Sequence, residues 1–138
     1  MYTDMFSAFL ASDDTLRIYQ DETLIFSSQK DQLLPLLEYI TDYGSEQQPV
    51  TLFDKIMGNA AALLAIKATC REVYSPLGSE LAIKTLEKFG IEYHLTEIVP
   101  YIQRPDGKGM CPMEKLSIGK EPEEFYQEIK TRIEANKK

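Results

Sequence analysis

Apolar residues in the first third of the chain recur at helical spacing, then at strand spacing, then at helical spacing again. Residues 2–10 carry aromatic and leucine side chains three or four positions apart, which predicts a short helix. Two short apolar runs on either side of a polar turn predict a β-hairpin over residues 15–26. A stripe of leucine and isoleucine over residues 33–40 predicts a helix that begins at Pro35 and ends at Gly44.

The middle of the chain alternates between predicted strands and predicted helices. An extended segment over residues 50–53 leads into an alanine-rich helix over residues 55–68, for which Asp54 is the expected N-cap. Strands over residues 72–74 and 91–99 flank a second predicted helix. This strand–helix–strand alternation is typical of parallel strands that are joined by right-handed crossovers.

The C-terminal third of the chain completes a layered α/β fold. Residues 103–112 hold two prolines and two glycines, which predicts a loop. Pro122, followed by two glutamates, predicts the start of a final helix. We therefore predict a single domain over residues 1–138, built as a three-layer α/β/α sandwich around a central mixed sheet.

Composition narrows the classes of function. The net charge of −7 argues against general binding to nucleic acid, because such binding depends on Lys and Arg side chains. The sequence lacks both a long apolar run and a signal-peptide pattern at its N-terminus, so we expect a cytoplasmic protein that does not bind membranes. Two cysteines and a single histidine offer few ligands for zinc, and we predict no metal and no cofactor.

Residues 73–80 lead into the second predicted helix with a pattern that resembles the cytidine-deaminase-like fold. Zinc deaminases of that fold carry His-x-Glu at the start of one helix and Pro-Cys-x-x-Cys at the start of the next. Here Met57 and Asn59 stand in place of the His and the Glu. Leu77 and Glu80 stand in place of the two cysteines. The resemblance thus implies the fold without its zinc site, and zinc deamination then lacks the water that the metal activates.

Two short motifs are similar to those of a bacterial family known as domain of unknown function 1893. Residues 54–63 match its Asp-Lys-x-x-Gly-x-Ala-Ala-Ala-Leu helix start. Cys111, Pro112 and Glu114 match its Cys-Pro-x-Glu segment. On these motifs the chain is identified as a member of this deaminase-like, metal-free family. Membership implies a fold and implies no established reaction.

The predicted site lies beyond the carboxyl ends of the strands, where open α/β sheets bind ligands near helix N-termini. The residues expected to act in catalysis are Asp54, Cys111 and Glu114, and those expected to bind a ligand are Lys55, Asn59, Ser75, Arg104 and Lys108. Several of these have structural alternatives, such as a helix cap for Asp54 and a buried, hydrogen-bonded amide for Asn59. Gly58 costs ~1 kcal/mol in a helix relative to Ala, which predicts that another group approaches closely there.

Cys111 is the sharpest single candidate. Because it precedes Pro112, its sulfur could cap a short helix, and the helix dipole would then favour the thiolate. Glu114 could bond back to the Cys111 amide, as in a capping box. The alternative is that Cys111 is a small buried hydrophobe. The one histidine that could serve as its base is His94.

Three functions stay open on the sequence. The leading hypothesis is a metal-free pocket that binds a small anionic or nucleotide-like molecule. The second is an enzyme that uses Cys111 as its nucleophile. The third is a non-catalytic scaffold or sensor that acts through a partner or as a homodimer, with Tyr2, Phe6 and Phe9 as the expected exposed surface. Whether the protein is an enzyme is left open.

Overall fold

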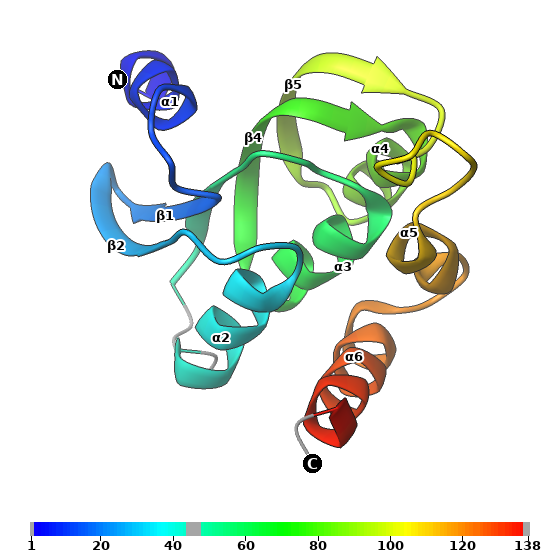
Figure 1. Ribbon diagram of the computed structural model, residues 1–138. Helices are drawn as coiled ribbons and strands as arrows, with labels where there is room; N and C mark the ends of the chain where they lie inside the picture. The colour runs from blue at the N-terminus through cyan, green and yellow to red at the C-terminus, as the bar shows by residue number, and fades with distance from the viewer. Residues whose placement is uncertain (1, 44–47, 137–138) are drawn as a thin grey trace.

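The computed structural model describes residues 2–43 and 48–136, and within them five strands form one mixed sheet that six helices flank (Figure 1). The elements in chain order are α1 (Tyr2–Leu10), β1 (Leu16–Gln20), β2 (Thr23–Ser28), α2 (Leu34–Tyr43), β3 (Val50–Asp54), α3 (Asn59–Lys67), β4 (Cys70–Ser79), α4 (Glu80–Lys88), β5 (Glu92–Val99), α5 (Pro112–Ser117) and α6 (Pro122–Asn136). Within the same residues, every helix falls short of the length and apolarity that a bilayer crossing requires.

The strands lie side by side in the order β2-β1-β3-β4-β5. β1 is antiparallel to both β2 and β3, whereas β3, β4 and β5 are parallel to one another. Each parallel step has a helix in its connection, α3 between β3 and β4 and α4 between β4 and β5. The predicted mixed sheet is confirmed, and the carboxyl ends of its three parallel strands share one edge.

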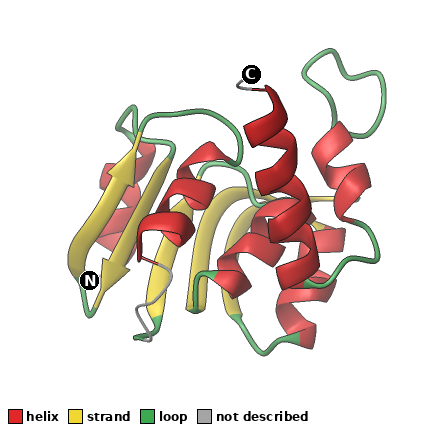
Figure 2. Cartoon of the chain, turned by 90° about the horizontal axis from the view of Figure 1, so that it is seen from below, coloured by secondary structure: helices red, strands yellow, loops and turns green. Residues whose placement is uncertain are grey.

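The sheet separates a thin helical layer from a thick one. α1 lies on one face, and the other helices lie on the opposite face, where α3 contacts each of α2, α4, α5 and α6 (Figures 1 and 2). β3 serves both faces, because Leu52 packs into the core beside α3 and the next residue, Phe53, packs under α1. The predicted three-layer arrangement is confirmed, with the buried, alanine-rich α3 at the centre of the thick layer.

Aromatic side chains hold α1 against the sheet. Phe9 is fully buried, and its ring lies 5.8 Å from the ring of Phe53. The half-buried Phe6 lies 5.6 Å from the rings of both Phe53 and Tyr74. Aromatic pairs at such distances stabilise a structure beyond the area they bury. The expectation that Tyr2, Phe6 and Phe9 form an exposed surface is therefore wrong, because the sheet face beneath α1 is itself aromatic and α1 covers it.

The predicted hairpin is confirmed, and its turn is unusual in composition. Asp21 and Glu22 connect the paired strands β1 and β2, and both have positive φ angles, 49° and 68°. Positive φ at both central residues defines the type I′ turn, whose twist matches that of the strands. The next element, α2, begins one residue before Pro35. Its predicted end at Gly44 lies outside the described residues.

β4 is longer than the predicted strand over residues 72–74. Its pairing with β5 passes from Ser75 to Leu77 across Pro76, which has no N–H to donate. The hydroxyl of the buried Ser75 compensates locally, because it donates to the Leu77 carbonyl at 2.9 Å and accepts from the Leu77 N–H at 3.3 Å. A proline that reads as a turn in the sequence is thereby accommodated inside a strand.

We predict that Phe9→Ala lowers the free energy of unfolding by about 3–5 kcal/mol, because it opens a cavity between α1 and the sheet. Leu10→Ala is the matched control: Leu10 is the next residue of the same helix and is 42% exposed, so its change should stay within about 0.5 kcal/mol. Urea denaturation of both variants measures the difference. Equal losses would contradict the docking of α1 through its aromatic face.

Candidate functional site

The candidate site begins at the carboxyl end of β3. Asp54 is the last residue of β3 and caps no helix, and α3 begins at Asn59, four residues later than predicted, with Gly58 as its N-cap. Met57 explains why α3 begins later in the sequence than predicted, because its N–H and its carbonyl both bond to the backbone of β4, at 2.8 and 3.1 Å. The predicted helix start is wrong, since bonds to a strand twenty residues away hold this segment extended.

A buried carboxylate from α5 lies at the N-terminus of α3. Glu114 is 2% exposed, and its two oxygens accept from the backbone N–H groups of Asn59, at 2.6 Å, and Ile102, at 2.7 Å. The Asn59 N–H opens the helix and has no partner within it, so the carboxylate satisfies an orphan donor at the positive end of the dipole. The predicted bond from Glu114 to the Cys111 amide is wrong, because that amide donates to the Ile102 carbonyl at 2.8 Å.

The side chain of Asn59 extends this buried polar cluster. Its amide nitrogen donates to the carbonyl and the hydroxyl of Ser117, at 3.2 and 3.0 Å, and its amide oxygen accepts from the hydroxyl of Thr85. The Ser117 hydroxyl in turn donates to the Glu114 carbonyl at 2.6 Å. The expectation of a buried, partnered amide is confirmed. In the part of the chain that the structure describes, each buried side-chain nitrogen or oxygen has a hydrogen-bond partner.

Gly58 is required by space rather than by backbone conformation. Its φ of −84° and ψ of 178° are extended values that any residue adopts. A Cβ added there would lie 2.9 Å from the Ile102 side chain and 3.0 Å from a carboxylate oxygen of Glu114. The predicted close approach is confirmed, and the groups that approach are the Ile102 side chain and the carboxylate that binds α3.

Lys55 turns toward the segment that follows α1, whereas the carboxylate of Asp54 bonds within its own loop. The Lys55 ammonium donates to the Ser12 carbonyl at 3.0 Å and lies 4.8 Å from the centre of the Phe9 ring. The Asp54 carboxylate accepts from the Ile56 N–H at 3.4 Å. Burial raises the pKa of Asp54 to about 7, so this carboxyl group is partly protonated near neutral pH.

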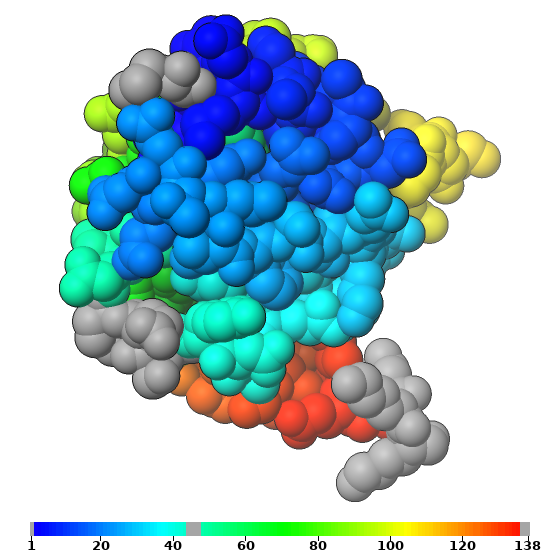
Figure 3. Space-filling model, turned by 90° about the vertical axis from the view of Figure 1, so that its left-hand side faces the viewer, coloured from blue at the N-terminus to red at the C-terminus, as the bar shows by residue number. Residues whose placement is uncertain are grey.

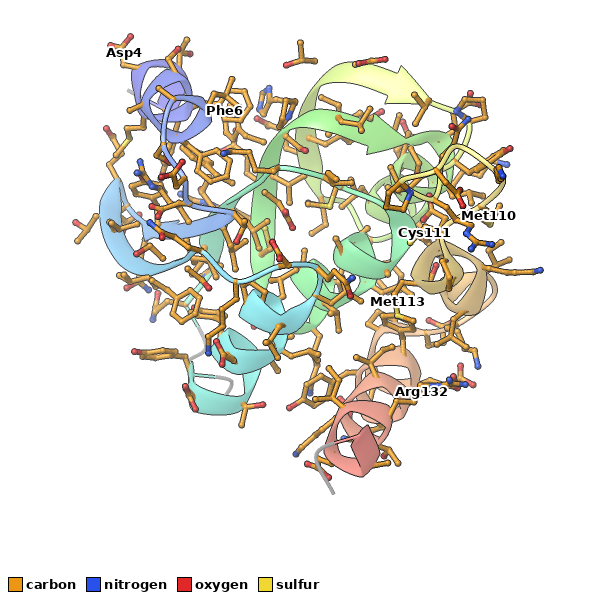
Figure 4. All side chains as sticks on the ribbon, in the orientation of Figure 1. Asp4, Phe6, Met110, Cys111, Met113 and Arg132 are labelled. Atoms are coloured by element: carbon orange, nitrogen blue, oxygen red, sulfur yellow. The ribbon has the colours of Figure 1, made fainter. Side chains whose placement is uncertain are left out.

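Cys111 precedes α5 as its N-cap, and the loop that leads to it projects from the body of the molecule (Figures 3 and 4). The Cys111 sulfur is partly exposed and makes no capping hydrogen bond. In the loop, the Arg104 N–H donates to the Gly109 carbonyl at 2.8 Å, which closes a narrow turn. The side chains of Arg104 and Lys108 are exposed on it, and the Arg104 guanidinium lies 3.9 Å from the carboxylate of Asp106.

The structure thus divides the predicted site residues. It brings Asn59 and Glu114 into direct contact, with Cys111 bonded to the same Ile102 backbone, and it places Lys55 beside the end of α1. The Asp54 carboxylate bonds to the Ile56 N–H. Ser75 is buried within β4. Two surface hollows of about 250 and 380 Å³ lie elsewhere, and none of the predicted site residues lines either of them.

Sequence reasoning missed three members of the polar cluster. Ser117 lies three residues after Glu114, a spacing that places both residues on one face of a helix, so the sequence contained a signal for this member. Ile102 and Thr85 offered no signal, because one contributes only its backbone N–H and the other joins from α4 across the core. Contacts of this kind follow from tertiary packing rather than from local pattern.

This architecture defines a mixed α/β domain in which a buried carboxylate from a short helix binds the N-terminus of the central helix. The chain belongs to the family described as TM1506, domain of unknown function (DUF1893), whose model matches residues 6–133. It is similar to the crystal structure of the DUF1893 family protein TM1506 from Thermotoga maritima, with 26% sequence identity and a TM-score of 0.85. That match covers 95% of this chain and 88% of the other. A search of curated proteins gave no match.

We predict that Glu114→Gln lowers the free energy of unfolding by about 2–4 kcal/mol, because the amide nitrogen cannot accept from a backbone N–H and leaves that donor buried and unpaired. Glu134→Gln, on the exposed face of α6, is the control and should change stability by no more than about 0.5 kcal/mol. Urea midpoints at one pH give both values. If Glu114→Gln leaves the free energy of unfolding unchanged, the structural role assigned to this carboxylate is wrong.

Asp54 should make stability depend on pH. Its pKa in the folded protein, about 7, exceeds its ordinary value of 3.8. Protonated Asp54 therefore contributes to the free energy of unfolding below about pH 4, and this contribution is lost as the pH rises through about 7. Asp54→Asn cannot ionise and should exceed the wild type in stability at pH 8, with the gap closing near pH 4. Denaturation at the two pH values measures it. A gap that is independent of pH contradicts the raised pKa.

Proposed function

We propose that this protein binds a small anionic or nucleotide-like molecule at the carboxyl edge of its sheet, through its own side chains and without a metal ion. On this proposal the domain is a cytidine-deaminase-like framework that has lost the zinc chemistry. The strand order, with β1 antiparallel beside three parallel strands, supports a ligand position at the edge where α3 and α4 begin.

The observation that carries the proposal is the position of Glu114. An anionic group already occupies the N-terminus of α3, bound by two backbone N–H groups, which is the geometry that helix N-termini offer to phosphate or carboxylate ligands. The Glu114 carboxylate holds the carboxyl edge of the sheet in place, and it excludes a second anion from the N-terminus of α3. A bound anion is therefore expected just outside it, against the cations of the neighbouring loop.

The loop over residues 103–110 supplies those cations. Arg104 and Lys108 are exposed on it, and Lys115 is exposed on α5 directly beyond it. Gly107 and Gly109 have φ angles of 72° and 122°, a conformation that other residues rarely adopt and that lets the backbone turn tightly here. In a chain with a net charge of −7, three cations beside a partly exposed thiol favour an anionic ligand over a cationic one.

A cysteine-dependent reaction is the second candidate, and the uncapped, partly exposed sulfur of Cys111 favours it. His94 cannot be its base. Cys111 bonds to Ile102, beyond the carboxyl end of β5, whereas His94 lies five residues before that end, roughly 16 Å away at the rise of a strand. Both oxygens of Glu114 already accept from backbone N–H groups, so on this alternative the ligand itself would accept the proton of the thiol.

Thermal denaturation in the presence of CMP, AMP, cytidine and inorganic phosphate tests the binding proposal. A ligand present at 100 times its Kd stabilises the folded protein by about 2.7 kcal/mol, which raises Tm by several degrees. We expect the double variant Arg104→Ala/Lys108→Ala to lose this shift. Lys84→Ala/Arg132→Ala removes two exposed cations from other helices and should keep it. The absence of a shift with every compound, or equal shifts in both variants, contradicts the proposal.

A further inference from the structure

A second group of ionisable side chains lies on the face of the sheet that α1 covers. Glu72 from β4 and Glu92 and His94 from β5 each place one ligand atom within 4.8 Å of the other two. The Nε2 atom of His94 lies 2.8 Å from a carboxylate oxygen of Glu72 and 3.0 Å from one of Glu92. These residues belong to the amino-terminal half of the parallel strands, at the end of the sheet opposite Glu114 and Cys111.

The strand register creates this convergence. Glu72 and Glu92 are register partners on neighbouring parallel strands, so their side chains project from one face side by side. His94 follows Glu92 by two residues and projects from the same face. Like charges opposite each other across strands destabilise a sheet. The fold therefore concentrates two carboxylates around one imidazole nitrogen, an arrangement that a divalent cation would stabilise.

Tyr74 holds the imidazole and one carboxylate in place. Its ring stacks on His94 with centroids 4.2 Å apart and planes 16° apart, and its hydroxyl donates to Glu72 at 3.2 Å. Hydrogen bonds of this kind to a metal-ligating carboxylate orient the ligand. The aromatic contacts of α1 fix Tyr74 in turn, because Phe6 lies 5.6 Å from its ring and points from α1 toward β4 (Figure 4). Two of the three donors, His94 and Glu72, are thus held before any ion arrives.

The cluster also borders open space. A surface hollow of about 380 Å³ adjoins His94, and it is lined by Thr3, Phe6, Tyr74, His94, Leu95 and Thr96. Zinc sites that retain an exchangeable position have three protein ligands and leave the fourth to water or a small molecule. Of the three donors, His94 lines the hollow, and a fourth coordination position beside it would stay open, whereas a closed structural site would need four protein ligands.

We propose that Glu72, Glu92 and His94 bind a divalent transition-metal ion, with Zn²⁺ as the reference ion, and leave one coordination position open to this hollow. One imidazole nitrogen and two carboxylate oxygens form a donor set that suits zinc. Ligands around Zn²⁺ stand roughly 3.4 Å apart, so the present contacts of 2.8 and 3.0 Å need to widen by about 0.5 Å. Glu92 is 67% exposed and has the freedom to make that adjustment.

This site is independent of the function proposed above, because it uses other residues at the other end of the sheet. The sequence predicts no metal, since two cysteines and one histidine are too few ligands by themselves. Carboxylates complete the set here, and their partnership with His94 depends on a parallel register that connects residues twenty positions apart. Local pattern alone does not reveal that register.

Calorimetric titration of the full chain with ZnCl₂, after removal of metal by a chelator, tests the proposal. We expect one Zn²⁺ per chain, and we expect His94→Ala and Glu92→Gln each to weaken binding at least about tenfold. Both residues are exposed, and circular dichroism will show that the variants fold. Tyr74→Phe keeps the stacked ring, removes the hydroxyl and should weaken binding by about tenfold.

Two controls separate this site from other zinc ligands. Glu97→Gln changes an exposed carboxylate on the same strand, and Cys111→Ser removes the partly exposed thiol, so both should bind as the wild type does. Replacement of Zn²⁺ by Co²⁺ gives a visible spectrum that reports oxygen and nitrogen ligands. The proposal is overturned if the wild type binds no stoichiometric zinc, if His94→Ala and Glu92→Gln bind as tightly as the wild type, or if Cys111→Ser abolishes binding.

Discussion

The contact between the Glu114 carboxylate and two backbone N–H groups is the constraint on which the carboxyl edge of this protein depends. One N–H belongs to the first residue of the central helix, and the other belongs to the segment that leaves the last strand. A single side chain from a six-residue helix therefore joins three parts of the chain that are far apart in sequence. Hydrogen bonds to a charged acceptor are stronger than neutral ones, and burial makes their loss costly.

That contact joins the two motifs of the sequence, residues 54–63 and 111–114, in one physical interaction. The glycine of the first motif leaves room for the carboxylate, and the glutamate of the second motif supplies it. Asn59 then fixes the far end of α5 through Ser117. The two motifs therefore form two sides of one interaction, which holds the short helix α5 against the start of α3.

Much of the fold could be predicted from local pattern. The hairpin, the alanine-rich central helix, the strand–helix alternation and the mixed sheet all follow from apolar periodicity and turn residues. The errors occur where distant strands override local preference. Met57 remains extended because β4 bonds to it, and Pro76 lies within a strand because Ser75 compensates for its missing donor. The burial of Phe9 was hidden for the same reason, since its partner surface lies on β1 and β3.

The site was proposed from the sequence residue by residue, but the sequence did not predict that these residues lie in separate parts of the structure. Asn59 and Glu114 meet in a buried cluster, whereas Lys55 belongs to the surroundings of α1. The local sequence does not determine in which direction the side chains at the end of a strand point, because that direction depends on the conformation of the loop that follows. The cluster around His94 illustrates the converse case, in which register joins residues that carry no recognisable spacing.

Amide hydrogen exchange measured residue by residue tests the central claim most directly. The Asn59 N–H occupies the first helical position, where no bond within the helix protects it, so any slow exchange there must come from Glu114. We predict strong protection of the Asn59 and Ile102 amides in the wild type and loss of protection at one of the two in Glu114→Gln, whose side chain keeps a single accepting oxygen, with the amides of β3 still protected. Fast exchange of both amides in the wild-type protein would contradict the claim that this carboxylate holds the edge together.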